Sequence, residues 1–280
     1  MSTDQPPTAD ALVEQGWALA QEKKYAEAVA VFTEALRLDP GNPRILCARA
    51  KCRVRREEYK QALADYDEAL RLAPDSADAW HDRGICWANQ EQWEKAVADY
   101  NRCIELNPDH TAVWNNRATA YLQMEKCREA LADFEEAARR NPDLEPLFYN
   151  RAHAWLQLKD YDRAFADFAE CLRRHPDLAG AWHARGQAYL DREQPELAAA
   201  DFTEAIRLQP DEAAPYLLRG QCYLRLDDLE KALADFEQAV RLRPKDANAW
   251  YLRGRVRLMR DELDAAVADL SEAVKLDPYH

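Results

Sequence analysis

Apolar residues recur along this chain at helical spacing, as pairs of stripes separated by short polar joints. In residues 77–110, one stripe contains Trp80 and Trp87, and a second contains Tyr100 and Cys103. Apolar residues three or four positions apart lie on one face of an α-helix. Because the joints are only a few residues long, each pair of stripes predicts two antiparallel helices that form a hairpin.

The hairpin pattern repeats with a fixed period of 34 residues, without insertion or deletion. Prolines mark the period at Pro40, Pro74, Pro108, Pro142, Pro176, Pro210, Pro244 and Pro278. A fixed period of this size is typical of a solenoid, in which each unit packs only against its neighbours. The sequence therefore predicts an all-α fold, with a short flexible tail at 1–8 and a single array at 9–280. Its eight frames are 9–42, 43–76, 77–110, 111–144, 145–178, 179–212, 213–246 and 247–280.

Small residues occupy one fixed position on each predicted helix of a hairpin. The first helix holds glycine or alanine there, as at Gly84, Gly186 and Gly220, and the second helix holds alanine, as at Ala96 and Ala198. Large aromatic residues opposite small ones allow two helices to approach closely without leaving a void. We expect the core of each hairpin to be built in this way.

This pattern resembles the tetratricopeptide repeat, and the resemblance covers nearly the whole chain. The residues that carry it in one frame are Trp182, Gly186, Tyr189, Ala198, Phe202 and Pro210. The resemblance implies a right-handed superhelix of helix hairpins. It also implies that the first helices line a concave groove, which members of the family use to hold peptides or helices of other proteins.

One departure from the family pattern is an arginine where the family has leucine on the first helix. It is accompanied by an aspartate on the second helix in the same seven frames. The arginines are Arg49, Arg83, Arg117, Arg151, Arg185, Arg219 and Arg253, and the aspartates are Asp65, Asp99, Asp133, Asp167, Asp201, Asp235 and Asp269. The first frame has neither, with Gln15 and Val31. This joint presence predicts ion pairs within repeats; the alternative is a row of arginines that binds anions.

Charge and composition exclude several classes of function. The net charge of −13 disfavours binding to nucleic acid, whose phosphates need a positive surface. No stretch is long and apolar enough to span a membrane, and the N-terminus lacks the features of a secretory signal. The seven cysteines form no CxxC pair, which favours a reducing compartment. We therefore expect a cytoplasmic protein that binds neither nucleic acid nor membrane.

No catalytic or cofactor-binding motif is present in the sequence. P-loop, GxGxxG, HExxH and GxSxG patterns are all missing. The six histidines do not come with the three or four converging ligands that a metal site requires. The sequence thus predicts no enzyme activity, no cofactor and no metal site.

Candidate binding residues are the first-helix positions that packing leaves free. They are Arg44, Lys51, Arg55, His81, Asn115, Asn116, Tyr149, Asn150, His153, His183, Gln187, Gln221, Arg225, Tyr251 and Arg255. Arg44, Lys51 and Arg55 are spaced i, i+7 and i+11, so they share one helical face. The amides and imidazoles of the middle frames can both donate and accept hydrogen bonds, which suits the backbone of an extended peptide.

The function that we expect is that of an adaptor or scaffold. Its concave groove would bind an extended or helical segment of a partner protein, with acidic groups near the ends of that segment. The alternative is a structural homo-oligomer, because the last predicted helix, 262–276, carries an apolar face without a polar helix to cover it. That face contains Leu263, Ala266, Val267, Leu270 and Val274. A third possibility, the recognition part of a larger enzyme assembly, leaves no mark in the sequence.

Overall fold

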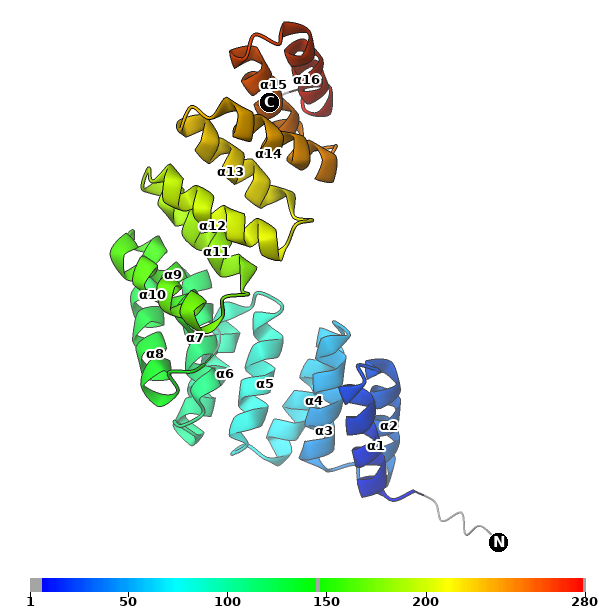
Figure 1. The fold of residues 1–280 in the computed structure, drawn as a ribbon. Helices are drawn as coiled ribbons and strands as arrows, with labels where there is room; N and C mark the ends of the chain where they lie inside the picture. Colours follow the sequence, from blue (N-terminus) through cyan, green and yellow to red (C-terminus); the bar gives the residue numbers. More distant parts are fainter. Residues whose placement is uncertain (1–6, 145–146, 279–280) are drawn as a thin grey trace. The chain divides into compact units, whose positions relative to one another are not determined.

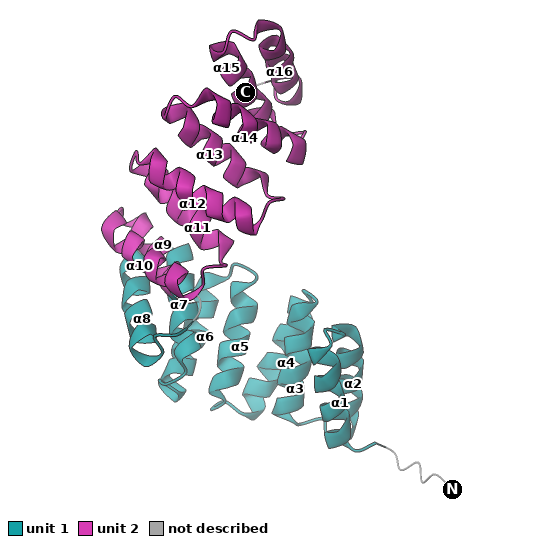
Figure 2. Ribbon diagram, viewed as in Figure 1, with its two compact units in different colours: residues 1–147 teal, residues 148–280 magenta. Residues whose placement is uncertain are grey.

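The computed structural model describes residues 7–144 and 147–278, and within these ranges it contains helices and no strand. The chain divides into two compact units, residues 1–147 and 148–280 (Figure 2). The fold is an all-α repeat of paired helices of the solenoid type (Figure 1). The right-handed superhelix and the single array over 9–280 stay predictions, and most of the predicted tail lies outside the described residues.

Unit 1 contains four helix hairpins. Their helices are α1 (Ala9–Gln21), α2 (Tyr25–Leu38), α3 (Pro43–Arg55), α4 (Tyr59–Leu72), α5 (Ala77–Ala88), α6 (Trp93–Leu106), α7 (Thr111–Gln123) and α8 (Cys127–Arg140). The frame boundaries expected from the prolines fall between these hairpins. The helix expected at 262–276 begins one residue later in the structure.

Unit 2 contains the remaining hairpins of the described chain, and the boundary between the units falls at the first residue of α9. Its helices are α9 (Leu147–Gln157), α10 (Tyr161–Arg174), α11 (Ala179–Asp191), α12 (Pro195–Leu208), α13 (Ala213–Arg225), α14 (Leu229–Leu242), α15 (Ala247–Met259) and α16 (Leu263–Leu276). Pro195 is at the first turn of α12, where its missing N–H is not needed by the helix.

Every hairpin turns through one residue in the left-handed region, and this residue is never glycine. The residues are Lys23, Glu57, Glu91, Glu125, Lys159, Glu193, Asp227 and Asp261, with φ between 56° and 63°. The residue after each one donates its N–H to a carbonyl five positions earlier, as Gln92 does to Trp87 at 3.0 Å. This is the closing bond of a Schellman motif, and it ends the first helix of each hairpin.

Between hairpins, an aromatic side chain of the next first helix holds the proline turn. The indole Nε1 of Trp80 donates to the Pro74 carbonyl at 2.9 Å, and Trp114, Trp182 and Trp250 make the same bond to their own prolines. Tyr216 replaces the indole with its hydroxyl in the seventh frame. The proline thus ends one hairpin, and its carbonyl orients the helix that begins the next.

The core of seven hairpins places a buried aromatic ring against a glycine or alanine, and in the eighth Leu270 takes the place of the ring opposite Gly254. The rings of Phe32, Phe134, Phe168, Phe202 and Phe236 have no exposed surface, and those of Tyr66 and Tyr100 are almost as buried. At Gly220, the Cβ atom of a larger residue would lie 2.7 Å from Cε1 of Phe236. The small residues expected from the sequence are therefore set by direct contact with the ring.

A Gly220→Val substitution should destabilise the protein by about 1–3 kcal/mol, because the added side chain overlaps the Phe236 ring and forces the core to shift. Gly180→Val is the matched control, since the nearest atom to its added Cβ would be the Tyr149 hydroxyl at 3.8 Å. Urea denaturation of both variants measures the difference. Equal midpoints for the two would contradict this account of the core.

Arginine and aspartate form a two-pronged ion pair in each of the seven frames that contain them. Nη2 of the arginine lies 2.6–2.8 Å from Oδ1 of the aspartate, and Nε lies 2.7–2.9 Å from Oδ2. The aspartates are buried, with Asp269 only 2% exposed. Hydrogen bonding to Asp235 raises the pKa of Arg219. Fork-to-fork geometry of this kind is the strongest form of the arginine–carboxylate pair.

The same arginines also contact the preceding hairpin. Nη1 of Arg83 lies 2.7 Å from Oδ1 of Asp67, and Nη1 of Arg49 and of Arg219 donates to a threonine at the equivalent position. Several guanidinium groups also stack on the tryptophan of their own helix, as Arg83 does on Trp80 at 4.7 Å. One side chain therefore joins two helices of a hairpin and ties that hairpin to its neighbour.

Removing one partner of this pair should be costly. An Asp201→Ala variant should lose about 3–5 kcal/mol of stability, because it leaves the Arg185 guanidinium half-buried without its carboxylate. Replacing both residues with leucine should recover most of the loss, since apolar side chains need no partner. Thermal and urea denaturation check both variants. A loss under about 1 kcal/mol for Asp201→Ala would mean that the pair behaves as an exposed one.

Candidate functional site

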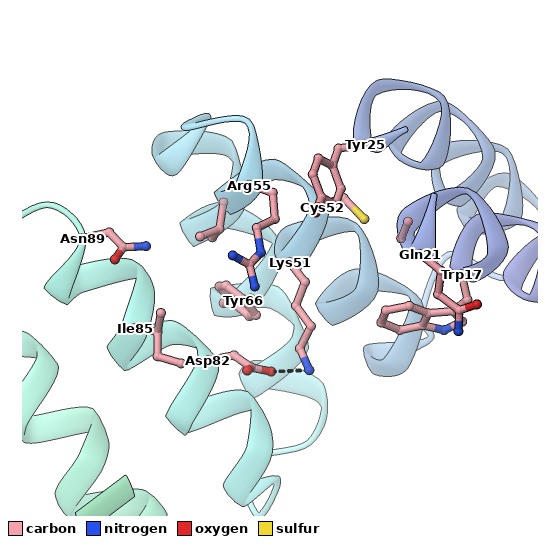
Figure 3. A pocket seen from close by; sticks show the side chains of 12 residues that line it. Trp17, Gln21, Tyr25, Lys51, Cys52, Arg55, Tyr66, Asp82, Ile85 and Asn89 are labelled. Atoms are coloured by element: carbon pink, nitrogen blue, oxygen red, sulfur yellow. Dashed lines mark ion pairs between the residues drawn. The ribbon is translucent and has the colours of Figure 1, made fainter. Parts of the chain in front are cut away.

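The first helices of unit 1 line two adjoining cavities. A cavity of about 560 Å³ and one of about 980 Å³ share Trp17, Lys51 and Asp82 as lining residues. These residues come from α1, α3 and α5, so the cavities follow successive first helices of the repeat (Figure 3). Together they form a groove across α3, which we call the α3 groove.

An ion pair lies at the centre of the α3 groove. Nζ of Lys51 is 2.9 Å from Oδ2 of Asp82, and the Asp82 side chain is only 15% exposed (Figure 3). Burial raises the pKa of the Asp82 carboxyl, and the neighbouring Lys51 opposes that rise. The sequence predicts Lys51 as part of a basic face that contacts a partner. In the structure Lys51 also forms an ion pair with a carboxylate of the next first helix, and its expected role stays a prediction.

Two exposed arginines lie at either end of α3 beside this pair. Arg44 lines the larger cavity and Arg55 the smaller. Among the described residues, neither guanidinium group forms an ion pair or a hydrogen bond. Eleven residues of helix separate them, which is about 16 Å along the axis. The groove thus has an exposed arginine at each end, and the larger cavity is also lined by Asp39 and Asp78.

Aromatic and apolar side chains form the wall between these charges. Trp17 is 41% exposed, packs edge-on against Phe32, and faces the smaller cavity together with Tyr25 and Tyr66. Trp17 and Tyr66 are not among the binding residues expected from the sequence. The signal was available: Trp17 is 34 residues before Lys51 and therefore occupies the same groove-facing position.

His81 and Asn116 lie at the far end of unit 1's first-helix surface, bonded to each other. Nδ2 of Asn116 is 2.9 Å from Nε2 of His81, and the His81 ring lies 4.5 Å from the ring of His110. Burial, with additional repulsion from His110 and Lys51, lowers the pKa of His81 to about 4. His81 is therefore a neutral hydrogen-bonding group near neutral pH.

A His81→Gln substitution should flatten the pH dependence of the free energy of unfolding between about pH 7 and pH 4. The unfolded chain protonates a histidine near pKa 6.5, whereas folded His81 stays neutral down to about pH 4. In this window the unfolded state binds the extra proton, so stability falls as the pH falls. The wild type should therefore lose on the order of 2 kcal/mol of unfolding free energy across this window, and the variant should not. Urea titrations at several pH values measure it, and parallel curves for variant and wild type would refute the assignment.

The first helices of unit 2 line a separate cavity of about 510 Å³. It brings together four of the candidate residues, Tyr149, His153, His183 and Gln187. Burial lowers the pKa of both His153 and His183, so both imidazoles are neutral at neutral pH. Nε2 of His153 is buried and has no hydrogen-bond partner within the described chain. This cavity offers hydrogen-bond donors and acceptors, and its lining includes the carboxylate of Glu212.

The remaining candidate residues are not gathered into either cavity. Asn115 is only 5% exposed, so its side chain is buried in the structure, and its expected contact with a partner stays a prediction. Asn116 belongs to unit 1 and Asn150 to unit 2. Arg225 donates to the Leu190 carbonyl at 3.1 Å.

At the end of unit 2, Gln221 is half-buried. Arg255 is exposed and lies 5.6 Å from the ring of Tyr251. None of the three cavities described above is lined by Gln221, Tyr251 or Arg255.

The side chains that line these cavities include charged, aromatic and amide groups. No group of three or more potential metal ligands occurs in the part of the chain that the structure describes. Burial raises the pKa of the Cys47 and Cys86 thiols to about 11, so neither is a thiolate at neutral pH. Charged, aromatic and amide groups face open grooves, which is an arrangement that suits recognition of side chains and backbone.

The helices of the described chain include none with the length and apolar character that crossing a membrane would require.

Comparison with known families matches tetratricopeptide repeat profiles along most of the chain. The matched residues are 19–81, 54–113, 88–147, 146–178, 183–247 and 223–280. The chain therefore belongs to the tetratricopeptide repeat family, as the resemblance indicated. A comparison with curated protein sequences gave no match.

Several solved structures share the fold at low sequence identity. A tetratricopeptide repeat protein from Parabacteroides merdae aligns with a TM-score of 0.66 and 21% identity, over 89% of this chain and 98% of that one. PilF of Pseudomonas aeruginosa aligns with a TM-score of 0.65 and 21% identity, over 76% and 95%. The Cut9–Hcn1 hetero-tetramer of the APC/C aligns with a TM-score of 0.60 and 17% identity, over 97% of this chain and 54% of that one. At these identities the likeness concerns the fold alone.

Proposed function

We propose that this protein is a non-catalytic interaction module whose α3 groove binds an acidic segment of a partner protein. Tetratricopeptide repeat proteins generally mediate protein–protein interactions, which supplies the general class. The specific proposal rests on Arg44 and Arg55, which form no ion pair within the described residues. They lie at the two ends of a groove lined by aromatic side chains.

The charge of α3 supports an acidic ligand. This helix contains Arg44, Arg49, Lys51, Arg53 and Arg55 and no acidic residue, whereas the whole chain carries a net charge of −13. Arg49 and Arg53 are bound to Asp65, and Lys51 is bound to Asp82. Arg44 and Arg55 are left to attract an acidic ligand, although Asp39 and Asp78 oppose it at the Arg44 end, and the net charge of −13 disfavours its binding elsewhere.

The dimensions of the groove fit a short extended segment. The two guanidinium groups are carried about 16 Å apart along α3, a distance that about five residues of extended chain would span. A segment with an acidic residue at each end would place its central residues against Trp17 and Tyr66. An apolar side chain there would displace water from the aromatic wall, which adds to the affinity.

The cavity of unit 2 supports backbone recognition by the same class of ligand. The neutral imidazoles of His153 and His183 and the amide of Gln187 can each donate or accept a hydrogen bond. An extended peptide has unpaired N–H and C=O groups along its length, so these side chains suit it without demanding a particular sequence. Specificity in this proposal therefore comes from α3.

A synthetic peptide with glutamates about five residues apart and a central leucine or phenylalanine should bind the wild-type protein, as measured by fluorescence anisotropy. An Arg44→Glu/Arg55→Glu variant should bind it at least about tenfold more weakly, because two attractive contacts become repulsive. Lys51 is left unchanged, since its reversal would also break the pair with Asp82.

Arg37→Glu/Arg71→Glu is the matched control. These arginines lie on α2 and α4, are well exposed, and pair with Glu34 and Glu68 of their own helices. The control has the same change in net charge and should retain nearly wild-type affinity. Equal weakening by both double variants would point to general charge attraction and remove the α3 groove from the site.

A further inference from the structure

The outer face of α16 exposes a row of large apolar side chains. Leu263 is 54% exposed, Val267 is 64% exposed and Val274 is 62% exposed. They are spaced by four and seven residues, so they share one side of the helix. Within the described chain, α16 is the last second helix of the repeat series (Figure 1).

Equivalent positions in earlier repeats show what this face normally contacts. Val240, which is 34 residues before Val274, is 6% exposed and packs against Ala249 of the following first helix. Leu172 is also 6% exposed and packs against Ala181 of its following first helix. The face of α16 therefore has the form of a surface that receives a first helix.

At the opposite end of the chain, α1 exposes the kind of surface that packs on such a second helix. On α1, Ala11 and Ala18 are exposed. The residues 34 positions later, Ile45 and Cys52, are both 2% exposed within the core that α3 shares with the preceding hairpin. The face of α1 therefore has the small apolar positions with which first helices pack on a preceding second helix.

We propose that the protein self-associates head to tail, with α1 of one copy packed on α16 of another. The repeat series would then continue across the junction with the same 34-residue period. Such an interface is heterologous, so it generates open chains or closed rings of copies rather than a two-fold dimer.

Charges at the two ends match in this arrangement. Arg255 occupies the position of Lys51, six repeats later, and Glu14 occupies the position of Asp82, two repeats earlier. Stacking a second copy as the next repeat places Glu14 beside Arg255, as Asp82 lies beside Lys51 at 2.9 Å. Both Arg255 and Glu14 are exposed in the single chain.

A second polar contact between successive hairpins has an equivalent in the proposed junction. Arg49 donates from Nη1 to Oγ1 of Thr33 on the preceding second helix at 3.2 Å. In the junction, Gln15 occupies the position of Arg49 and Ser271 occupies that of Thr33. A glutamine amide can donate to a serine hydroxyl in the same way. The first frame lacks the arginine, yet it retains a hydrogen-bond donor at this position.

A symmetric pairing of two α16 faces is the competing arrangement. It would also cover Val267 and Val274, but it leaves Ala11 and Ala18 exposed and gives Arg255 and Glu14 no partner. The match at both ends of the chain, in apolar surface and in charge, favours the head-to-tail junction.

Complementation between blocked ends tests the proposal. A Val267→Lys/Val274→Lys variant has a blocked C-terminal face, and an Ala11→Arg/Ala18→Arg variant has a blocked N-terminal face. Sedimentation velocity over a wide concentration range should show wild type growing beyond one chain and each variant remaining a single chain. An equimolar mixture of the two should form a complex of two chains, since each retains the end that the other needs. Leu197→Lys, at an exposed apolar side chain of α12, is the control and should associate like wild type.

Charge reversal provides a second measurement that does not depend on blocking the apolar faces. Glu14→Arg and Arg255→Glu should each weaken association by at least about tenfold, and the combined variant should restore it. A wild-type protein that stays a single chain at every concentration would overturn the proposal. So would self-association of the Ala11→Arg/Ala18→Arg variant, which is the result expected of symmetric α16 pairing.

The outcome is separable from that for the α3 groove. Ala11, Glu14 and Ala18 do not line either cavity of that groove. Peptide binding can therefore be measured on both blocked variants as single chains, and its presence or absence bears only on the groove.

Discussion

The arginine–aspartate pair is the interaction on which the repeat depends. A single guanidinium group binds a buried carboxylate of its own hairpin through two hydrogen bonds, and in several frames it also reaches an oxygen of the preceding hairpin. An ion pair taken out of water contributes little net stability by itself, but breaking it is costly. In the seven hairpins that contain it, the pair therefore penalises any packing that would separate the arginine from the aspartate. The aromatic-on-glycine contact limits how closely the helices approach, and in seven of the eight hairpins the ion pair adds a second fixed contact between them.

This division of roles leaves the groove-facing positions free to vary. The position shared by Trp17 and Lys51 holds isoleucine at Ile85, histidine at His153 and arginine at Arg255. Lys51 contacts the next hairpin through its ion pair with Asp82, but the arginine–aspartate pairs do not involve this position. In the proposed function, recognition therefore depends on differences between repeats, whereas the fold depends on what the repeats share.

The same distinction explains what the sequence could predict. The helices, their hairpin pairing and the partners of Arg185 and its equivalents repeat many times, so the pattern itself indicates them. The contact between Lys51 and Asp82 occurs once in the described residues, joins two first helices and has no counterpart that would reveal it. Asn115 looked like its neighbour Asn116, but the rotation of α7 buries one and leaves the other half-buried. Features that occur in a single repeat could be found only in the structure, whereas features that recur with the period could be predicted from the sequence.

The arginine bonds and the indole–proline bonds join residues that are close in the sequence, and this affects how the number of repeats can change in evolution. The arginine bonds join residues 16 positions apart, and the indole–proline bonds join residues six apart. None of these contacts reaches beyond an adjacent hairpin. Duplication or loss of a whole 34-residue segment would therefore restore the same contacts at the new joint, and array length could evolve without any compensating substitution in the core.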